Sequence, residues 1–352
     1  MSPFLQPAMR RQSGPDPLGI LASCAPVIDQ MTHVAIDLQA IDRLAGRLAT
    51  DEVPPPEWDA GTHFHGTGPN CLEQTIGWIF ALDALNFCFW AQGPDPTFRW
   101  RIRSGNKVYD GYMALAIALR DAALAGTPIW DPAWLASVDE REARRILRPE
   151  PGSDDIPLLA DRVNNLREVG NALRAHGGSA HPFTDFIEEC GRSAPVIVQR
   201  VVELMPSFND VALWPPGEKR TARVVRFHKR AQILASDLAG ALEGTSMPIA
   251  HRDQLTAFAD YKVPQVMREL GILRYGEGLA AHIRSRALLE PRGAEEIEIR
   301  AATIWGCELL RQALSGHGRH FTAADVDWLL WNQGQHLPST SEPYHRTVTM
   351  FY

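Results

Sequence analysis

A carboxylate set among aromatic residues is the feature of this sequence that most directly suggests chemistry. Asp260 lies within the run Phe258-Ala259-Asp260-Tyr261-Lys262-Val263-Pro264-Gln265. Pro264 favours an extended backbone before it and suits the first turn of a helix, so we expect Asp260 on a loop just before a helix N-terminus. One interpretation is a cap of that helix. The other is a carboxylate in an aromatic pocket, poised against positive charge that develops during a reaction.

Two cations, Lys229 and Arg230, stand at the start of an amphipathic helix that we expect over about 227–242. The N-terminus of a helix attracts anions, so this pair is a candidate site for a phosphate group. Paired basic residues on a solvated helix face are the commoner alternative.

A late segment offers polar and aromatic groups on one predicted helix. Trp328 and Asn332 lie four residues apart and share a helix face, whereas Asp327 is rotated by about 100° from Trp328. The three residues line one pocket only if that pocket wraps around the helix or the helix ends nearby. Glu296 and Arg300 are also four residues apart, which predicts an ion pair on the surface.

An early loop carries His63 and His65, which point the same way if the segment is extended, and Cys71 follows. A fourth metal ligand at short spacing is missing, and so is the HExxH motif. The motifs GxGxxG, GxxxxGK[ST] and GxSxG, which mark dinucleotide, nucleotide and serine hydrolase sites, are also absent from the sequence. We therefore expect neither a metal nor a cofactor.

The elements that must position these groups are mostly helices. Apolar residues recur at helical spacing through most of the chain, and Ser137 with Glu140 and Thr322 with Asp325 are candidate capping boxes. We expect a strand pair only within 98–109, where Ser104-Gly105-Asn106 supplies the turn. The fold class is thus mostly α: about ten helices in a single compact multi-helix domain with a minor β-hairpin. Helical periods are expected over about 36–48, 72–90, 158–173, 227–242, 297–314 and 327–331.

Composition limits the partners and the location. Among 352 residues, 35 Lys and Arg face 42 Asp and Glu, a formal charge of −7, whereas proteins that track a duplex carry a basic excess. The longest apolar tract, 76–91, is shorter than the roughly 18 residues of a membrane span. Five cysteines without a CxxC pair indicate reduced thiols. We expect a cytoplasmic protein that binds neither a nucleic acid polymer nor a membrane, with a disordered leader over 1–15 before a domain over 16–352.

Six sequence blocks occur together in this chain: 85–90 (LNFCFW), 229–234 (KRAQIL), 258–265 (FADYKVPQ), 296–300 (EIEIR), 327–331 (DWLLW) and 343–347 (PYHRT). In this order they resemble the queuosine salvage protein family, the queuosine 5′-phosphate N-glycosylase/hydrolases. The resemblance extends from about residue 16 to the C-terminus, so no single short motif has to carry it.

The resemblance implies hydrolysis of the N-glycosidic bond of queuosine 5′-monophosphate to queuine and ribose 5-phosphate, which salvages queuine for tRNA modification. It also implies a mostly helical fold akin to the helix-hairpin-helix DNA glycosylases. The family's catalytic aspartate falls on Asp260. Its base-pocket positions fall on Phe258, Asp327 and Trp328, with the histidine of the early loop on His63.

Some positions leave alternatives open. His65 competes with His63 because the early loop aligns in two ways. Trp328 stands where some members carry tyrosine, and Asn332 stands where some carry aspartate, so its amide can bind a guanine-like edge but has no negative charge. Lys229 becomes the candidate for the 5′-phosphate, because a monophosphate requires a cation or a helix N-terminus.

The reaction class leaves the role of Asp260 open. Breaking a ribosyl C–N bond builds positive charge on the sugar, which a carboxylate can stabilise directly, by activating water or as a nucleophile. Queuine is a 7-deazaguanine without a nitrogen at position 7, so hydrogen bonds must stabilise the departing base, and Asp327, Asn332 and His63 are the candidates. Two alternatives are a queuine carrier without turnover and a glycosylase that acts on another modified nucleoside.

Overall fold

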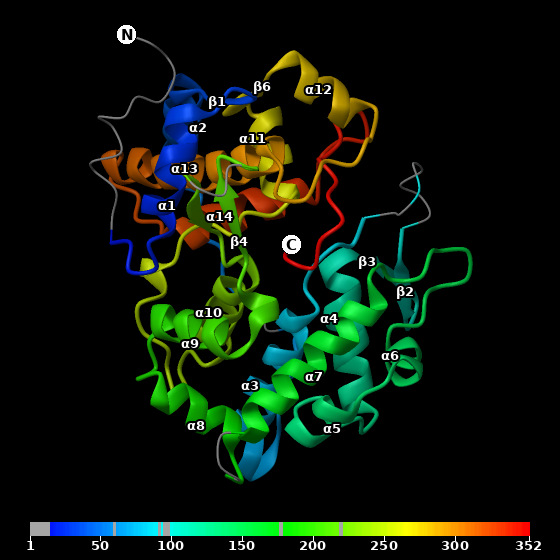
Figure 1. The fold of residues 1–352 in the computed structure, drawn as a ribbon. Helices are drawn as coiled ribbons and strands as arrows, with labels where there is room; N and C mark the ends of the chain where they lie inside the picture. Colours follow the sequence, from blue (N-terminus) through cyan, green and yellow to red (C-terminus); the bar gives the residue numbers. More distant parts are fainter. Residues whose placement is uncertain (1–14, 59–60, 91–92, 94–98, 176–178, 218–220) are drawn as a thin grey trace. The chain divides into compact units, whose positions relative to one another are not determined.

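The computed structural model describes most of the chain, and its secondary structure is mainly helical (Figure 1). The described residues contain 14 α-helices and three antiparallel pairs of short strands. The mostly-α fold class predicted from the sequence is confirmed, although the sequence predicts only about ten helices. The described residues are 15–58, 61–90, 93, 99–175, 179–217 and 221–352.

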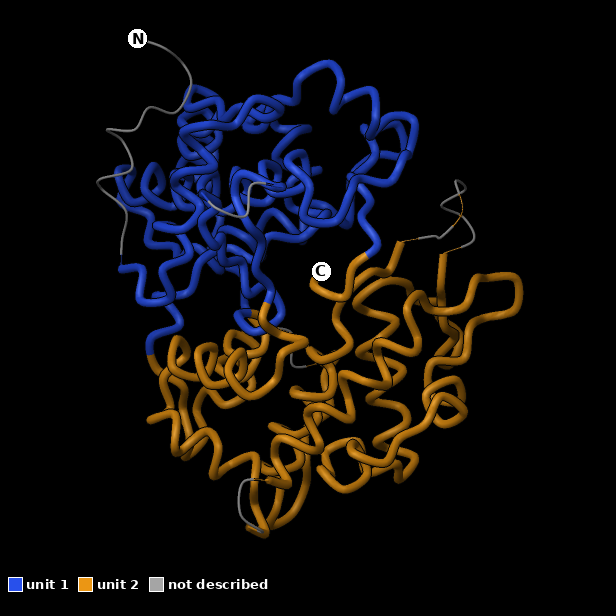
Figure 2. Tube along the Cα trace, in the orientation of Figure 1, with its two compact units in different colours: residues 1–57, 210–232, 251–348 blue, residues 58–209, 233–250, 349–352 orange. Residues whose placement is uncertain are grey.

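The chain separates into two compact units, each assembled from segments that are distant in the sequence (Figure 2). The leader expected over residues 1–15 lies outside the described residues, except for Pro15. Unit 1 contains residues 1–57, 210–232 and 251–348, and unit 2 contains residues 58–209, 233–250 and 349–352.

Helix α13 (Ala294–Gly316) forms the centre of unit 1, because every side chain from 296 to 310 is buried. A helix that is buried all round belongs in a core, and helices of unit 1 pack on it from several sides (Figure 1). Four of them contact α13 directly: α1 (Ile20–Gln30), α2 (Leu38–Thr50), α11 (Lys262–Glu269) and α14 (Ala323–Gly334). Unit 1 also contains α12 (Glu277–Arg284) and the first four residues of α10 (Lys229–Ala241).

Two strand pairs of unit 1 were not predicted. Strand β1 (Val34–Ile36) pairs antiparallel with β6 (Leu273–Tyr275), and β4 (Val211–Trp214) pairs antiparallel with β5 (Arg223–Arg226). The strands have only three or four residues each. Such short segments carry little alternation, so the expectation of one strand pair was wrong.

The core of unit 2 is built around α3 (Cys71–Ala84), whose side chains from 75 to 84 are all buried. The remaining helices of unit 2 are α4 (Gly111–Leu124), α5 (Pro132–Ser137), α6 (Glu140–Ile146), α7 (Leu159–Ala175), α8 (Pro182–Glu189) and α9 (Ala194–Leu204), together with the later part of α10. Helices α4, α7 and α8 contact α3, and α7 in turn contacts α5 and α6.

The hairpin predicted within 98–109 is confirmed. Strand β2 (Arg101–Ser104) pairs with β3 (Lys107–Asp110), so that Gly105 and Asn106 form the turn. Gly105 has a φ of 55°, a left-handed conformation that glycine adopts without a steric cost.

Helix α3 ends earlier than the sequence predicts, at Ala84 instead of near residue 90. The reason lies in α7, because the buried guanidinium of Arg162 donates to the carbonyl oxygens of Leu85, Phe87 and Cys88. The amide of Asn165 donates to the oxygen of Ala84 at 3.1 Å. Side chains of α7 thus satisfy carbonyl groups of the chain as it leaves α3, which allows the helix to end there.

One of the two predicted capping boxes is confirmed. The hydroxyl of Thr322 accepts the N–H of Asp325 at 3.0 Å, and the carboxylate of Asp325 accepts the N–H of Thr322 at 2.9 Å. The box predicted at Ser137 is wrong, because Ser137 is the last residue of α5. The cap of α6 is Asp139, whose carboxylate accepts the N–H of Glu142 at 2.8 Å.

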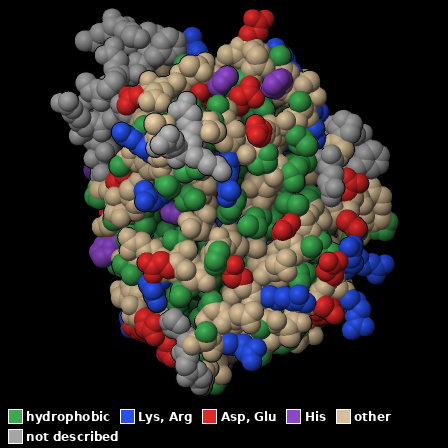
Figure 3. Space-filling view, viewed as in Figure 1, with side chains coloured by type: hydrophobic (Ala, Val, Ile, Leu, Met, Phe, Trp, Pro, Cys, Tyr) green, Lys and Arg blue, Asp and Glu red, His purple; other side chains and the backbone are tan. Residues whose placement is uncertain are grey.

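The surface carries charges of both signs. On the face drawn in Figure 3, the Lys and Arg side chains of the described residues are interspersed with Asp and Glu. None of the described helices combines the length and the apolar character needed to cross a membrane.

Candidate active site

Asp260 lies on the loop that leads into α11, and its side chain is only 8% exposed. Its Oδ1 accepts the backbone N–H groups of Lys262 and Val263, both at 2.8 Å. Asp260 thus caps the helix, as one of the two interpretations of the sequence predicts. Its Oδ2 makes no hydrogen bond to the described residues, so the cap occupies only one of the two carboxylate oxygens.

Opposing influences act on the ionisation of Asp260. Burial raises the pKa of its carboxyl group above the ordinary value, since a charge is poorly solvated in the interior. The charge of Lys229 and the N–H groups of Val263 and Lys262 lower the pKa in part. The carboxylate is therefore desolvated but has a cation and two fixed donors to hold its negative form.

Asp327, on α14, is a second buried carboxyl group beside this loop, and it is 3% exposed. Its Oδ1 accepts the backbone N–H of Phe258 at 2.8 Å. Burial, and next the charge of Asp260, raise the pKa of Asp327 well above its ordinary value. A nearby negative charge disfavours ionisation, so burial and Asp260 both favour the neutral form of the Asp327 carboxyl group, while the Phe258 N–H and Lys229 oppose them in part.

The aromatic and amide candidates differ in their surroundings. Phe258 is buried at 3% exposure and lies two residues before Asp260. Trp328 is half-buried on α14. Asn332, one turn later, is exposed, and its side chain makes no hydrogen bond to Asp260 or Asp327. The structure therefore brings Phe258 and Asp327 to the Asp260 loop by direct contact, but not the side chain of Asn332.

Lys229 is the first residue of α10 and is 5% exposed, while Arg230 is 1% exposed. The alternative of a solvated basic face is therefore wrong. The charge of Lys229 lowers the pKa of both Asp260 and Asp327. Its ammonium group is thus a counter-charge to the carboxyl pair, a relationship that the sequence does not reveal.

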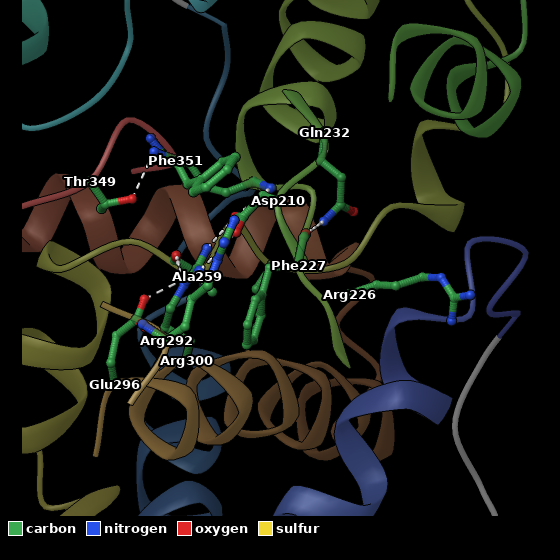
Figure 4. Close-up of polar contacts among 12 residues, drawn as sticks. Asp210, Arg226, Phe227, Gln232, Ala259, Arg292, Glu296, Arg300, Thr349 and Phe351 are labelled. Carbon is green, nitrogen blue, oxygen red and sulfur yellow. Dashed lines mark hydrogen bonds and ion pairs between the residues drawn. The ribbon is translucent and has the colours of Figure 1, made fainter. Parts of the chain in front are cut away.

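The expected surface ion pair of Glu296 and Arg300 is also wrong in its location, because both side chains are 3% exposed. Arg300 Nη1 lies 3.5 Å from Glu296 Oε1. The main partner of Arg300 is Asp210, to which Nη1 donates at 3.0 Å and which Nη2 also contacts. Figure 4 shows this buried pair next to Ala259 and Phe227. The sequence could not predict it, since the two residues are 90 positions apart.

His63, in unit 2, belongs to a group of hydrogen-bonded side chains within that unit. Its Nε2 lies 2.6 Å from the hydroxyl oxygen of Tyr112, and the Tyr112 hydroxyl donates to Asp237 Oδ2 at 3.3 Å. Trp58 Nε1 donates to Asp237 Oδ1 at 3.3 Å, and the Trp58 ring stacks on His63 with centroids 4.3 Å apart. The sequence does not predict this group, because no local pattern links Trp58, Tyr112 and Asp237 to His63.

The two early histidines have different environments. His63 is 5% exposed, whereas His65 is exposed and meets the Trp58 ring edge-on at 5.7 Å. Within the described residues, no three His, Cys, Asp or Glu side chains gather as a metal site would require.

Comparison with known proteins supports the family resemblance. The family model described as queuosine salvage protein matches residues 65–352. A relative from Sphaerobacter thermophilus named queuosine 5′-phosphate N-glycosylase/hydrolase is 44% identical over 338 residues, which cover 96% of this chain and 98% of the relative. A relative of the same name from Mus musculus is 31% identical and covers 96% of this chain and 99% of its own length. In Dictyostelium discoideum, a third relative of that name is 32% identical over 80% of this chain and 79% of its own. This chain, with its buried Asp260 loop, therefore belongs to the queuosine salvage protein family.

Proposed function

We propose that this chain hydrolyses the N-glycosidic bond of queuosine 5′-monophosphate and releases queuine and ribose 5-phosphate for salvage into tRNA modification. The names of its relatives support the substrate and the reaction. The observation that carries the proposal is the Asp260 carboxylate, with Oδ1 fixed by two N–H groups and Oδ2 making no hydrogen bond to the described residues.

Asp260 supplies the negative charge of the reaction. As the C–N bond breaks, positive charge grows on the sugar, and an ionised carboxylate in a desolvated setting stabilises it strongly. The fixed Oδ1 and the nearby charge of Lys229 favour the ionised form. Oδ2 is then free to face the sugar or to accept a proton from the attacking water.

Asp327 takes the opposite role because it keeps its proton. A neutral carboxyl group donates a hydrogen bond, which an ionised one cannot. A donor of this kind stabilises the negative charge that grows on a departing base without a nitrogen at position 7. Two carboxyl groups with pKa values pushed apart in this way are typical of paired acid and base roles.

The remaining candidates concern substrate binding. We assign Phe258 and Trp328 to stacking on the flat base. We assign Asn332 to hydrogen bonding with its edge, and His63, the buried histidine of unit 2, to hydrogen bonding with the substrate. Lys229 is assigned to the 5′-phosphate, since an ammonium at a helix start suits a phosphate. No metal or cofactor is included in this proposal.

We further propose that the glycosylase domain extends over residues 16–352 and that the protein acts in the cytoplasm on this small molecule, without a nucleic acid polymer or a membrane as partner. Matches over nearly the whole chain support the extent of the domain. The five free cysteines support a reducing compartment. The formal charge of −7 argues against a duplex as substrate.

The test is incubation of the purified chain with queuosine 5′-monophosphate, with free queuine followed by mass spectrometry. We expect queuine and ribose 5-phosphate in equal amounts, with one ¹⁸O in the sugar product when the water is labelled. Binding of the nucleotide without release of the base would instead support the carrier. Faster release of a base from guanosine 5′-monophosphate or from a damaged duplex would support another glycosylase.

A further inference from the structure

Arg300 and Asp210 form a deeply buried ion pair. Both side chains are 3% exposed, and a buried pair contributes little net stability unless its geometry and its further hydrogen bonds are good. Here each of the three guanidinium nitrogens of Arg300 has a partner. Nη1 and Nη2 bind the two oxygens of Asp210, and Nε donates to the carbonyl oxygen of Ala259 at 3.1 Å.

Ala259 directly precedes Asp260, so Arg300 holds the backbone of the loop that carries the proposed catalytic carboxylate. The centre of the Arg300 guanidinium also lies 4.0 Å from the centroid of the Phe227 ring. A guanidinium over an aromatic face is fixed in its plane as well as in its distance. Figure 4 shows Arg300, Ala259, Asp210 and Phe227 in this arrangement.

Asp210 holds the second element, the start of α10. Its backbone oxygen accepts the N–H groups of Phe227 at 3.0 Å and His228 at 3.1 Å. Its Oδ2 lies 3.5 Å from the backbone N of Lys229. His228 has a φ of 46°, a left-handed conformation that a non-glycine residue keeps only where its surroundings fix it.

We propose that Arg300 is a positioning residue: through Ala259 and Asp210 it fixes the Asp260 carboxylate relative to the Lys229 ammonium. This inference rests on the proposed function. One side chain thereby joins the two segments that carry the proposed catalytic and phosphate-binding groups of unit 1.

The position of Lys229 controls the ionisation of Asp260. The charged side chains that act on this carboxyl pair are Lys229, Lys262 and, for Asp327, Asp260 itself. The pair in turn raises the pKa of the buried Cys307 thiol, which stays neutral. Lys229 is the largest charge influence that lowers the pKa of Asp260. If Lys229 moves away, that pKa rises, and the ionised form needed for catalysis appears only at higher pH.

A second connection links these two segments independently of Arg300. Gln232 Nε2 donates to the oxygen of Phe227 at 3.0 Å, and Gln232 Oε1 accepts the N–H of Thr256 at 2.9 Å. These bonds tie the start of α10 to the segment before Phe258 without Arg300. Figure 4 shows the bond between Gln232 and Phe227. A conservative change of Arg300 is thus expected to loosen the arrangement without unfolding it.

The test compares Arg300→Lys with the wild type in the pH profile of kcat/KM for queuosine 5′-monophosphate. Lysine keeps the charge but cannot bind both Asp210 oxygens and Ala259 at once. We expect kcat to fall about tenfold to a hundredfold and the acidic limb to move to higher pH. The substrate phosphate ionises in the same way in the wild-type and Arg300→Lys experiments. A difference between their acidic limbs therefore comes from the enzyme.

The matched control is Arg311→Lys, which changes an arginine on the same helix that pairs with Glu308 at 2.8 Å and does not contact the Asp260 loop. We expect it to leave kcat and the acidic limb unchanged. Arg300→Lys could instead lower activity only in proportion to the amount of folded protein and keep the acidic limb of the wild-type profile. The role of Arg300 would then be purely structural, and the inference would be overturned.

If Arg300→Lys does not fold, Phe227→Leu decides the question, because it leaves both charges in place and removes only the aromatic face. A limb shifted in the same direction supports the inference, and an unchanged limb overturns it. Failure of the proposed function is a separate outcome. In that case the wild type itself releases no queuine, whereas failure of this inference leaves wild-type turnover intact.

Discussion

Asp327 Oδ1 accepts the backbone N–H of Phe258 at 2.8 Å, which ties α14 to the loop that carries Asp260. The contact makes one carboxyl group serve two purposes. One oxygen fixes the loop, and the other makes no hydrogen bond to the described residues. The raised pKa of Asp327 favours the neutral carboxyl group, in which that second oxygen can carry a proton and donate it.

Replacement of Asp327 by asparagine tests this division of roles. The amide keeps an acceptor for Phe258 and an N–H donor in place of the carboxylic O–H, so we expect a loss in kcat of about tenfold or less. Asp327→Ala removes both groups and leaves the Phe258 N–H buried, at a cost of about 1–3 kcal/mol in stability. Kinetics of both variants check this, and an equal loss in the two would contradict a neutral Asp327.

The same pKa shift predicts how stability depends on pH. Burial and the charge of Asp260 raise the folded-state pKa of Asp327, so its contribution to folding is complete below its unfolded pKa, about 4. That contribution is lost as pH rises from there through the folded pKa. Urea unfolding of wild type and Asp327→Asn between pH 4 and 8 should show the wild type losing stability relative to the variant. A constant difference across this range would show that Asp327 ionises normally.

Much of the helical fold could be predicted because its signals are local. The long apolar periods of α7 and α13, the Thr322 capping box and the turn at Gly105 each lie within one short segment. The position of Asp260 before a helix follows in the same way from Pro264.

What could not be predicted depends on contacts between distant segments. Val34 pairs with Tyr275, and Arg300 binds Asp210 across 90 positions. Helix α3 stops at Ala84 because of a side chain on α7. A local pattern such as the four-residue spacing of Glu296 and Arg300 predicts a pair but not its burial, because burial is decided by the rest of the fold.

The chain from His63 through Tyr112 to Asp237 yields a further prediction. The single hydroxyl hydrogen of Tyr112 goes to Asp237, so His63 Nε2 must donate to the Tyr112 oxygen. Tyr112→Phe leaves that donor without its acceptor at a cost of about 1–3 kcal/mol. We expect Tyr112→Phe to have a raised KM for queuosine 5′-monophosphate. The control is Tyr109→Phe, which makes the same change at a tyrosine of β3. Identical kinetics in the two variants would remove His63 from the site.

A variant of Lys229 distinguishes two roles of this residue, a contact to the 5′-phosphate and a counter-charge to the carboxyl pair. If it binds the 5′-phosphate, Lys229→Met should raise KM for queuosine 5′-monophosphate at least about tenfold but raise KM for queuosine much less. The exposed Lys107→Met is the matched control. Equal effects on nucleotide and nucleoside would assign Lys229 to the carboxyl pair alone.

The central claim is that the Asp260 carboxylate performs the reaction. Its most direct test measures queuine release and nucleotide binding by Asp260→Asn, beside the exposed neighbour variant Asp253→Asn. The amide can still accept the N–H groups of Lys262 and Val263, so we expect a folded protein that binds queuosine 5′-monophosphate. Its turnover should fall by about a thousandfold or more, while Asp253→Asn matches the wild type. Release of queuine by Asp260→Asn at a rate near that of the wild type would contradict the account.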